Sequence, residues 1–280
     1  PGVSSRFGEK RPRVVVVPHE GEAFDSFAPG NRNFYYEAAQ SMREMYGSDS
    51  VSLFHVDPGE SPERWHARLI DFLIATDATH VMGHVESDPG QASGSWTWDR
   101  FWARASRSWD GVLLGVMFDS SFKWLAAQSR LLARISPRFL LVDICIPMDG
   151  RMVRGRPEVG PINMPMSLES IALLDARLAG VNPSVDVSFI GAMYPYRVEL
   201  VERLRSMGIS ISVNPHRLEP AEDFVASRTN QPSWLDYMAG LASSRMTLNF
   251  SQSSAGRFVQ LKTRVLEAGL AGTVLLTDDV

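Results

Sequence analysis

Short apolar runs alternate along this chain with longer stretches in which apolar residues recur every three or four positions. The first run, Val14–Val17, is wholly β-branched and follows a charged segment, which predicts a buried parallel strand. The helical spacing of residues 33–45 predicts a helix after it. Further strands are expected at 51–56, 80–85, 111–118 and 139–146, with helices from 61, at 98–108 and at 122–135. This alternation predicts an open, mostly parallel α/β sheet.

A loop-like segment and a second alternating series follow. Residues 149–165 hold three arginines, three glycines and three prolines, a composition typical of loops. Beyond them, helices are expected at 167–178, 196–207, 233–243 and just before the last strand, and strands at 187–190, 209–213, 246–250 and 273–276.

The two series predict two domains. We expect a tail at 1–10, a Rossmann-like domain at 11–165, a linker region at 166–185 and a second Rossmann-like domain at 186–280. A doubly wound domain usually continues with more helices, so the second domain is expected to be incomplete at its C-terminus.

Composition and charge indicate which binding partners and which cellular compartment to expect. The chain has 280 residues, 44% hydrophobic and 21% charged, which is ordinary for a soluble globular protein. Its formal charge of −4 gives no global cationic field, so we expect no nucleic-acid partner. The single cysteine, Cys145, excludes an intramolecular disulfide and fits a cytoplasmic protein. No apolar run approaches the ~18–20 residues that span a bilayer, so no transmembrane segment is predicted.

The closing segment carries the clearest chemistry. Lys262 and Arg264 stand at an expected helix start, where cations and the helix N-terminus favour a phosphate-bearing ligand. Glu267 follows one turn later, and a carboxylate accepts hydrogen bonds from sugar hydroxyls. Together they predict a nucleotide-sugar site. The alternative is a solvated helix end, with Arg264 and Glu267 as an i,i+3 ion pair.

Three motifs in this half carry a family resemblance. They are Phe189-Ile-Gly-Ala-Met-Tyr-Pro-Tyr-Arg197, Met246-Thr-Leu-Asn-Phe-Ser251 and Lys262-Thr-Arg-Val-Leu-Glu-Ala-Gly-Leu-Ala-Gly272. They resemble GT-B glycosyltransferases, in particular the group-1-like family that includes the CgeB spore-maturation proteins. The match covers residues 186–280, and the first domain only as a pattern of alternating elements. The resemblance implies two Rossmann-like domains facing a cleft, with the nucleotide diphosphate-sugar on the second and the acceptor on the first.

The resemblance also implies roles for single residues. Glu267 would bind the ribose hydroxyls, and Lys262 and Arg264 would neutralise the diphosphate, including the charge that develops as it leaves. Gly191 would let the backbone approach the donor, and Arg197 at the next helix start would assist.

The strand-end residues Asn249 and Ser251 belong to the same expected donor site. The chain departs from the family pattern at one position. Many retaining GT-B enzymes carry two glutamates eight residues apart, whereas Val259 stands eight residues before Glu267. The donor-sugar contact of the first glutamate is therefore missing, and inverting and retaining outcomes both stay open.

Four residues of the first domain are candidates for catalysis or substrate contacts, and three of them, His19, His84 and Asp119, lie at the carboxyl ends of predicted strands. His19 follows the first strand and is either a catalytic base or a loop histidine. His84 ends the third strand and either contacts substrate or packs in the interior. Asp119 either orients the acceptor or caps the next helix. Trp96, in the aromatic loop 90–98, either stacks on a sugar or joins the core.

These expectations combine into one function. The chain is expected to be a metal-independent glycosyltransferase that moves a sugar from a nucleotide diphosphate-sugar co-substrate to an acceptor hydroxyl, with no resident cofactor. The acceptor is open among glycan, lipid, protein and small molecule. The sequence contains no Asp-x-Asp motif, so the metal-diphosphate mode of GT-A enzymes has no support. A non-catalytic nucleotide- or sugar-binding module and a nucleotide-sugar epimerase of the same architecture are the alternatives.

Overall fold

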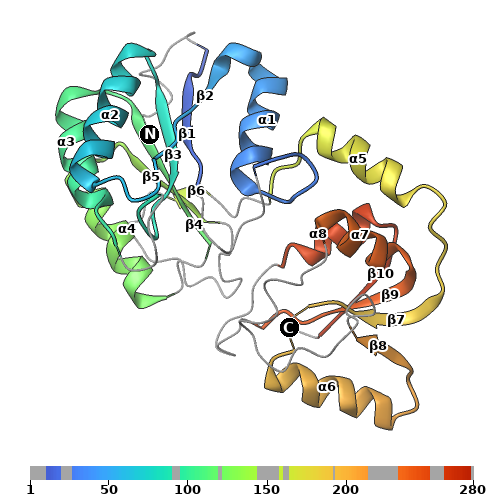
Figure 1. The fold of residues 1–280 in the computed structure, drawn as a ribbon. Coiled ribbons are helices and arrows are strands. Elements are labelled where there is room, and N and C mark those ends of the chain that lie inside the picture. The colour runs from blue at the N-terminus through green and yellow to red at the C-terminus, as the bar shows by residue number, and fades with distance from the viewer. Residues whose placement is uncertain are drawn as a thin grey trace. The chain divides into compact units, whose positions relative to one another are not determined.

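The structure is a computed structural model that describes residues 11–19, 27–89, 95–118, 122–143, 158–159 (as backbone), 164–191, 193–213, 233–252 and 262–278. The described residues up to Leu168 form one compact unit, and those from Glu169 onward form a second. Each unit contains a parallel sheet with helices packed on it (Figure 1). The predicted mixed α/β class is confirmed, whereas the GT-B arrangement of two domains stays a prediction.

In the N-terminal unit, the described residues form one parallel sheet in the order β2-β1-β3-β4-β5-β6. The chain leaves β1 for β2 on one side and returns to β3 on the other side. The strand order therefore reverses between β1 and β3, which is the topological switch point of this sheet. The strands are β1 (Val14–Val17), β2 (Val51–Leu53), β3 (His80–His84), β4 (Val112–Met117), β5 (Phe139–Asp143) and β6 (Glu158–Val159).

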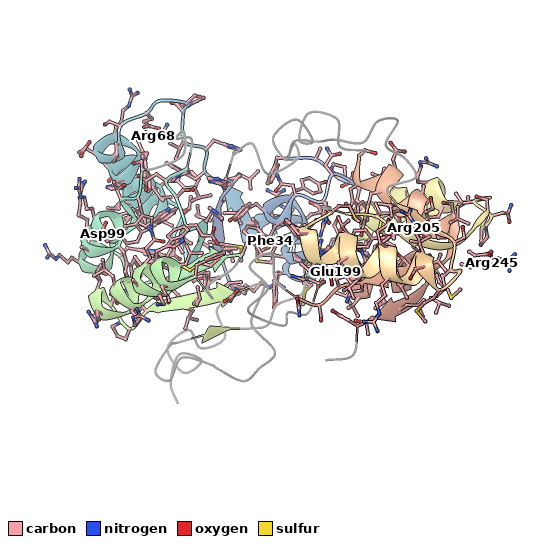
Figure 2. The ribbon with its side chains drawn as sticks, turned by 90° about the horizontal axis from the view of Figure 1, so that it is seen from below. Phe34, Arg68, Asp99, Glu199, Arg205 and Arg245 are labelled. Carbon is pink, nitrogen blue, oxygen red and sulfur yellow. The ribbon has the colours of Figure 1, made fainter. Side chains whose placement is uncertain are left out.

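Helices cover both faces of this sheet (Figure 1). Phe34 and Tyr35 of α1 (Phe34–Tyr46) pack with Val14 and Val16 on one face. The other face is covered by α2 (Pro62–Ala75), α3 (Trp98–Ser108) and α4 (Lys123–Ile135). A short 3₁₀ helix, Ser48–Ser50, precedes β2. Figure 2 shows Phe34 against the sheet, whereas Asp99 lies on the outer side of α3.

The buried side chain of Trp98 requires a glycine on the neighbouring strand β3. Its side chain is 0% exposed, and its indole N–H donates to the Ser87 carbonyl over 2.8 Å. A Cβ atom at Gly83 in β3 would lie 2.6 Å from the Trp98 ring, so only glycine leaves room for the indole. Trp98 is therefore the first residue of α3 and a core residue. Of the two alternatives for the aromatic loop, stacking on a sugar or packing in the core, Trp98 follows the second.

The C-terminal unit has the same plan with fewer strands. Its described residues form a parallel sheet in the order β10-β9-β7-β8, so its switch point lies between β7 and β9. Helix α6 covers one face, and α7 and α8 cover the other (Figure 1). The elements are α5 (Leu168–Leu178), β7 (Val185–Phe189), α6 (Pro195–Ser206), β8 (Ile211–Val213), α7 (Trp234–Ala242), β9 (Ser244–Asn249), α8 (Arg264–Leu270) and β10 (Val274–Thr277).

The prediction of loop throughout residues 149–165 is wrong at one point. Glu158–Val159 forms β6, which pairs in parallel with Leu141 and Val142 of β5. Two residues are too few to show an alternating pattern, and this strand is defined by its ladder with β5 rather than by its own composition.

Candidate functional site

Three of the predicted donor-site residues lie at the switch point of the C-terminal sheet. Gly191 lies just beyond β7, Asn249 ends β9, and Arg264 opens α8. The carboxyl ends of the two strands beside a switch point form the crevice in which open α/β sheets bind ligands. Helix α8 has only seven residues, so the side chains at the strand ends, rather than its N-terminus, define the candidate site.

Arg264 joins the two central strands at this point. Its guanidinium donates through Nη2 to the Ile190 carbonyl and through Nη1 to the Leu248 carbonyl, the latter over 3.4 Å. The same group lies 4.9 Å from the centre of the Phe189 ring. Its Nε is buried and has no hydrogen-bond partner among the described residues. Arg264 therefore brings a permanent positive charge to the switch point while holding β7 beside β9.

Gly191 is required by the approach of this arginine. Its φ is +155°, and an added Cβ would lie 2.8 Å from Arg264 Nη2. Any larger residue would push the guanidinium away from the strand ends. The glycine expected to let the backbone approach a donor thus also makes room for Arg264.

Substituting Gly191→Ala is expected to destabilise the C-terminal unit by about 1–3 kcal/mol and to displace the Arg264 guanidinium. Urea unfolding curves measure this change. The matched control is Gly269→Ala in α8, where a Cβ meets nothing within 4 Å. Alanine favours a helix more than glycine does, so the control should be neutral or stabilising. Equal losses in the two variants would contradict this role for Gly191.

Two buried polar residues line the end of β9. Asn249 is 3% exposed and donates through Nδ2 to Thr277 Oγ1 over 3.2 Å. Ser251 is 4% exposed, and its backbone N–H donates to Asp278 Oδ1 over 2.9 Å. Within the described part of the chain, Asn249 Oδ1 and Ser251 Oγ have no hydrogen-bond partner. Buried polar atoms are rarely left unsatisfied, so these two indicate a place for a polar ligand.

Asp278 was missed by the sequence reading. Its carboxylate holds the Ser251 backbone, and its own N–H donates to the Asn249 carbonyl over 3.3 Å. The signal available in the sequence is its place directly after the last strand, whereas Asn249 is predicted from the Met246–Ser251 motif that carries the family resemblance.

Glu267 lies inside the unit rather than on its surface. It is 5% exposed, and Glu267 Oε2 accepts a hydrogen bond from the Tyr237 hydroxyl over 2.8 Å. This burial rules out the alternative of a solvated ion pair at the end of a helix. Lys262 is half-buried and lies two residues before the first residue of α8.

Arg197 reaches the same end of β7 from α6. It is buried, its guanidinium lies 4.6 Å from the Tyr194 ring and 5.7 Å from the Phe189 ring, and its Nε donates to the Tyr196 hydroxyl over 2.8 Å. Phe189 is therefore approached by the guanidinium groups of both Arg197 and Arg264. Two arginines near one strand end favour binding of an anion.

In the N-terminal unit, the structure brings His19 and His84 together at the other switch point. His19 follows β1 and His84 ends β3, the neighbouring parallel strand. The two imidazole rings have centres 4.3 Å apart and are tilted by 30°. Glu86 Oε2 lies 3.7 Å from His84 Nε2, and Glu86 Oε1 accepts a hydrogen bond from the Phe118 backbone N–H. Two residues predicted separately therefore form a single cluster.

Burial keeps this histidine pair neutral. It lowers the pKa of His19, and burial together with the nearby His19 lowers the pKa of His84 to about 3. In contrast, burial and the charge of Glu86 raise the pKa of Tyr35, whose ring centre lies 6.4 Å from that of His84. A neutral imidazole has a lone pair that can take a proton. The strongly lowered pKa of His84 makes it the poorer base, so His19 suits that task better.

The histidine pair predicts how stability changes with pH. The pKa of His84 is 6.5 in the unfolded chain and about 3 in the fold, so between these values only the unfolded state binds the proton. The free energy of unfolding should therefore fall as the pH drops through this window. Between pH 7 and pH 5, the free energy of unfolding of His84→Gln is expected to fall by about 1–2 kcal/mol less than that of the wild type. Urea titrations at the two pH values measure both changes. Identical losses would show that His84 does not titrate in this way.

The remaining two candidates have different outcomes. Trp96 packs against the core of its unit, and its indole N–H donates to the Val85 carbonyl over 2.8 Å. The segment that carries Trp96 is fixed by buried Asp88, which accepts hydrogen bonds from Ser95 Oγ over 2.6 Å and from the Thr97 backbone over 2.7 Å. Asp119 lies outside the described residues, and its role stays a prediction.

Two further features concern membranes and metals. Within the described ranges, no helix has both the length and the apolar character needed to cross a membrane. In the same ranges, no three side chains of the His, Cys, Asp and Glu types gather as ligands for a metal ion.

No protein-family model matches this sequence, and no curated protein matches it either. A solved mutant of the XylFII-LytSN complex is 10% identical, with a TM-score of 0.26, over 95% of this chain and 96% of that one. An ABC transporter solute-binding protein from Burkholderia graminis C4D1M, in complex with D-arabinose, is 14% identical, with a TM-score of 0.27, over 94% of this chain and 87% of that one. At these scores neither likeness bears on the fold or function of this chain.

Proposed function

We propose that the C-terminal unit binds a nucleoside diphosphate-sugar at the β7/β9 switch point, and that the protein transfers the sugar to an acceptor hydroxyl without a metal. One observation carries the proposal. Asn249 Oδ1 and Ser251 Oγ are buried without partners in the described part of the chain, at the same strand ends that the Arg264 guanidinium joins. A ligand suited to this place has both hydrogen-bonding groups and negative charge.

A nucleoside diphosphate-sugar has both properties. Its diphosphate would lie in the positive field of Arg264 and Lys262, and its ribose hydroxyls would donate to the carboxylate of Glu267. The two Nη atoms of Arg264 already donate to backbone carbonyls. Arg264 therefore acts mainly through its charge and through its Nε, and Lys262 adds a second positive charge.

Transfer would follow the chemistry of this ligand. The acceptor oxygen attacks the anomeric carbon, and the bond from that carbon to the diphosphate oxygen breaks with its electron pair on the leaving diphosphate. Arg264 and Lys262 would stabilise the negative charge that develops there. For retention, an oxygen of the leaving diphosphate takes the acceptor proton; inversion needs a neutral base, and neutral His19 has the chemistry for that task.

A ligand panel tests the binding step. UDP, GDP, TDP and their sugars are added at millimolar concentration while thermal unfolding is followed. A ligand that binds only the folded state raises its stability by about 2.7 kcal/mol at a hundred times its Kd. An upward shift with at least one nucleotide supports the proposal, and no shift with any of them contradicts it. Binding without sugar transfer to any tested acceptor would favour the non-catalytic binding module.

A further inference from the structure

Tyr237 and Glu267 link the two helices on one face of the C-terminal sheet. Tyr237 belongs to α7, and its hydroxyl donates to Glu267 Oε2 of α8 over 2.8 Å. The glutamate is buried, and a carboxylate removed from water depends on such hydrogen bonds. The phenol therefore restrains the carboxylate of the residue that we place at the ribose.

Helix α7, which carries Tyr237, makes hydrogen bonds to other elements near both of its ends. Near its start, Asp236 Oδ1 accepts from Arg177 Nη2 of α5 over 2.9 Å. Near its end, the Leu241 carbonyl accepts from Thr273 Oγ1, just before β10, over 2.7 Å. A side chain on an anchored helix keeps its geometry better than one on a loop.

We infer that Tyr237 is a positioning residue of the nucleotide site. Its hydroxyl holds Glu267 Oε2 and thereby sets the plane of the carboxylate, so that the carboxylate meets the ribose hydroxyls without reorienting. The inference rests on the proposed function and adds a residue and a specificity to it. Because the Tyr237 hydroxyl acts through Glu267, its effect is confined to ligands that carry ribose hydroxyls. The site therefore prefers ribonucleoside diphosphates to their dideoxy forms.

Calorimetric titration tests this role with two matched ligand pairs, UDP with 2′,3′-dideoxy-UDP and GDP with 2′,3′-dideoxy-GDP. The wild type should bind at least one ribonucleotide more tightly than its dideoxy form. Tyr237→Phe should lower the affinity for that ribonucleotide about fivefold to tenfold. It should change the affinity for the dideoxy form less than about twofold, because the missing hydroxyls remove the contact with Glu267. The control is Tyr46→Phe on exposed α1 surface, which should match the wild type.

Each other result overturns the inference. Equal losses for the two members of a pair would show that Tyr237 acts on the fold or on another part of the ligand. Unchanged affinity in Tyr237→Phe, or a wild type that binds the two members of each pair equally, would show that the phenol does not support a ribose contact. A wild type that binds neither UDP nor GDP overturns this inference, and the proposed function falls with it only if TDP and the nucleotide-sugars also fail to bind. The other results leave the proposed function standing.

Discussion

Replacing Glu267 by glutamine is expected to lower the affinity for the nucleoside diphosphate by about tenfold to a hundredfold. A hydrogen bond to a charged group contributes about 1.5–3 kcal/mol, more than one to a neutral amide. Glutamine has nearly the same size, and its carbonyl oxygen still accepts from the Tyr237 hydroxyl. The change therefore removes the charge and leaves the packing of α7 on α8. Calorimetric titration of the nucleotide into the variant measures the loss.

Glu199→Gln is the matched control for this variant. Glu199 lies on the exposed surface of α6, where it is labelled in Figure 2. Its substitution should leave both the affinity and the free energy of unfolding unchanged. If Glu267→Gln keeps the wild-type affinity and instead lowers the stability of the unit, Glu267 is a structural residue and the proposed ribose contact is wrong.

Replacing Trp98 by alanine is expected to lower the free energy of unfolding by about 3–5 kcal/mol. The indole is wholly buried, packs with Trp65 and Phe101 at ring-centre distances of 5.3 and 5.4 Å, and fills the space above Gly83. Removing it leaves a cavity and also takes the hydrogen-bond donor from the Ser87 carbonyl. Urea unfolding followed by circular dichroism measures the change in midpoint.

Trp124→Ala is the matched control, because it also removes a tryptophan but not a buried one. Trp124 lies on α4 and is 54% exposed, so its substitution should change the free energy of unfolding by about 0.5 kcal/mol or less. A Trp124 variant as unstable as the Trp98 variant would contradict the assignment of Trp98 to the core.

Local patterns predicted the elements well. The run Val14–Val17 reads as a buried strand because all four residues are apolar and β-branched, and the structure has β1 at those residues. The helix expected at 33–45 is α1, displaced by one residue at each end. In both segments the apolar pattern and the tertiary packing favour the same structure.

The order of the strands was not predictable in the same way. The sequence places His19 and His84 after two different strands, yet their contact depends on β1 and β3 being neighbours in the sheet. Strand neighbours are determined by long-range packing, which leaves no local periodicity. The same limit applies to Arg264, whose bond to the Leu248 carbonyl reflects the position of α8 on the sheet.

Tyr237 was missed for a related reason. It lies thirty residues before Glu267 in an ordinary amphipathic segment, and no spacing rule connects the two. Glu267 is predicted as a site residue from its place in a motif. Its contact with Tyr237 depends on the packing of α7 against α8, which the local sequence does not show.

The most direct test is an experimental structure of the protein with the nucleoside diphosphate that gives the largest thermal shift. We expect the diphosphate beside Arg264, the ribose hydroxyls within hydrogen-bond distance of Glu267, and ligand contacts to Asn249 Oδ1 or Ser251 Oγ. A nucleotide bound away from the β7/β9 switch point, with Glu267 contacting only Tyr237 and other protein groups, would contradict this expectation.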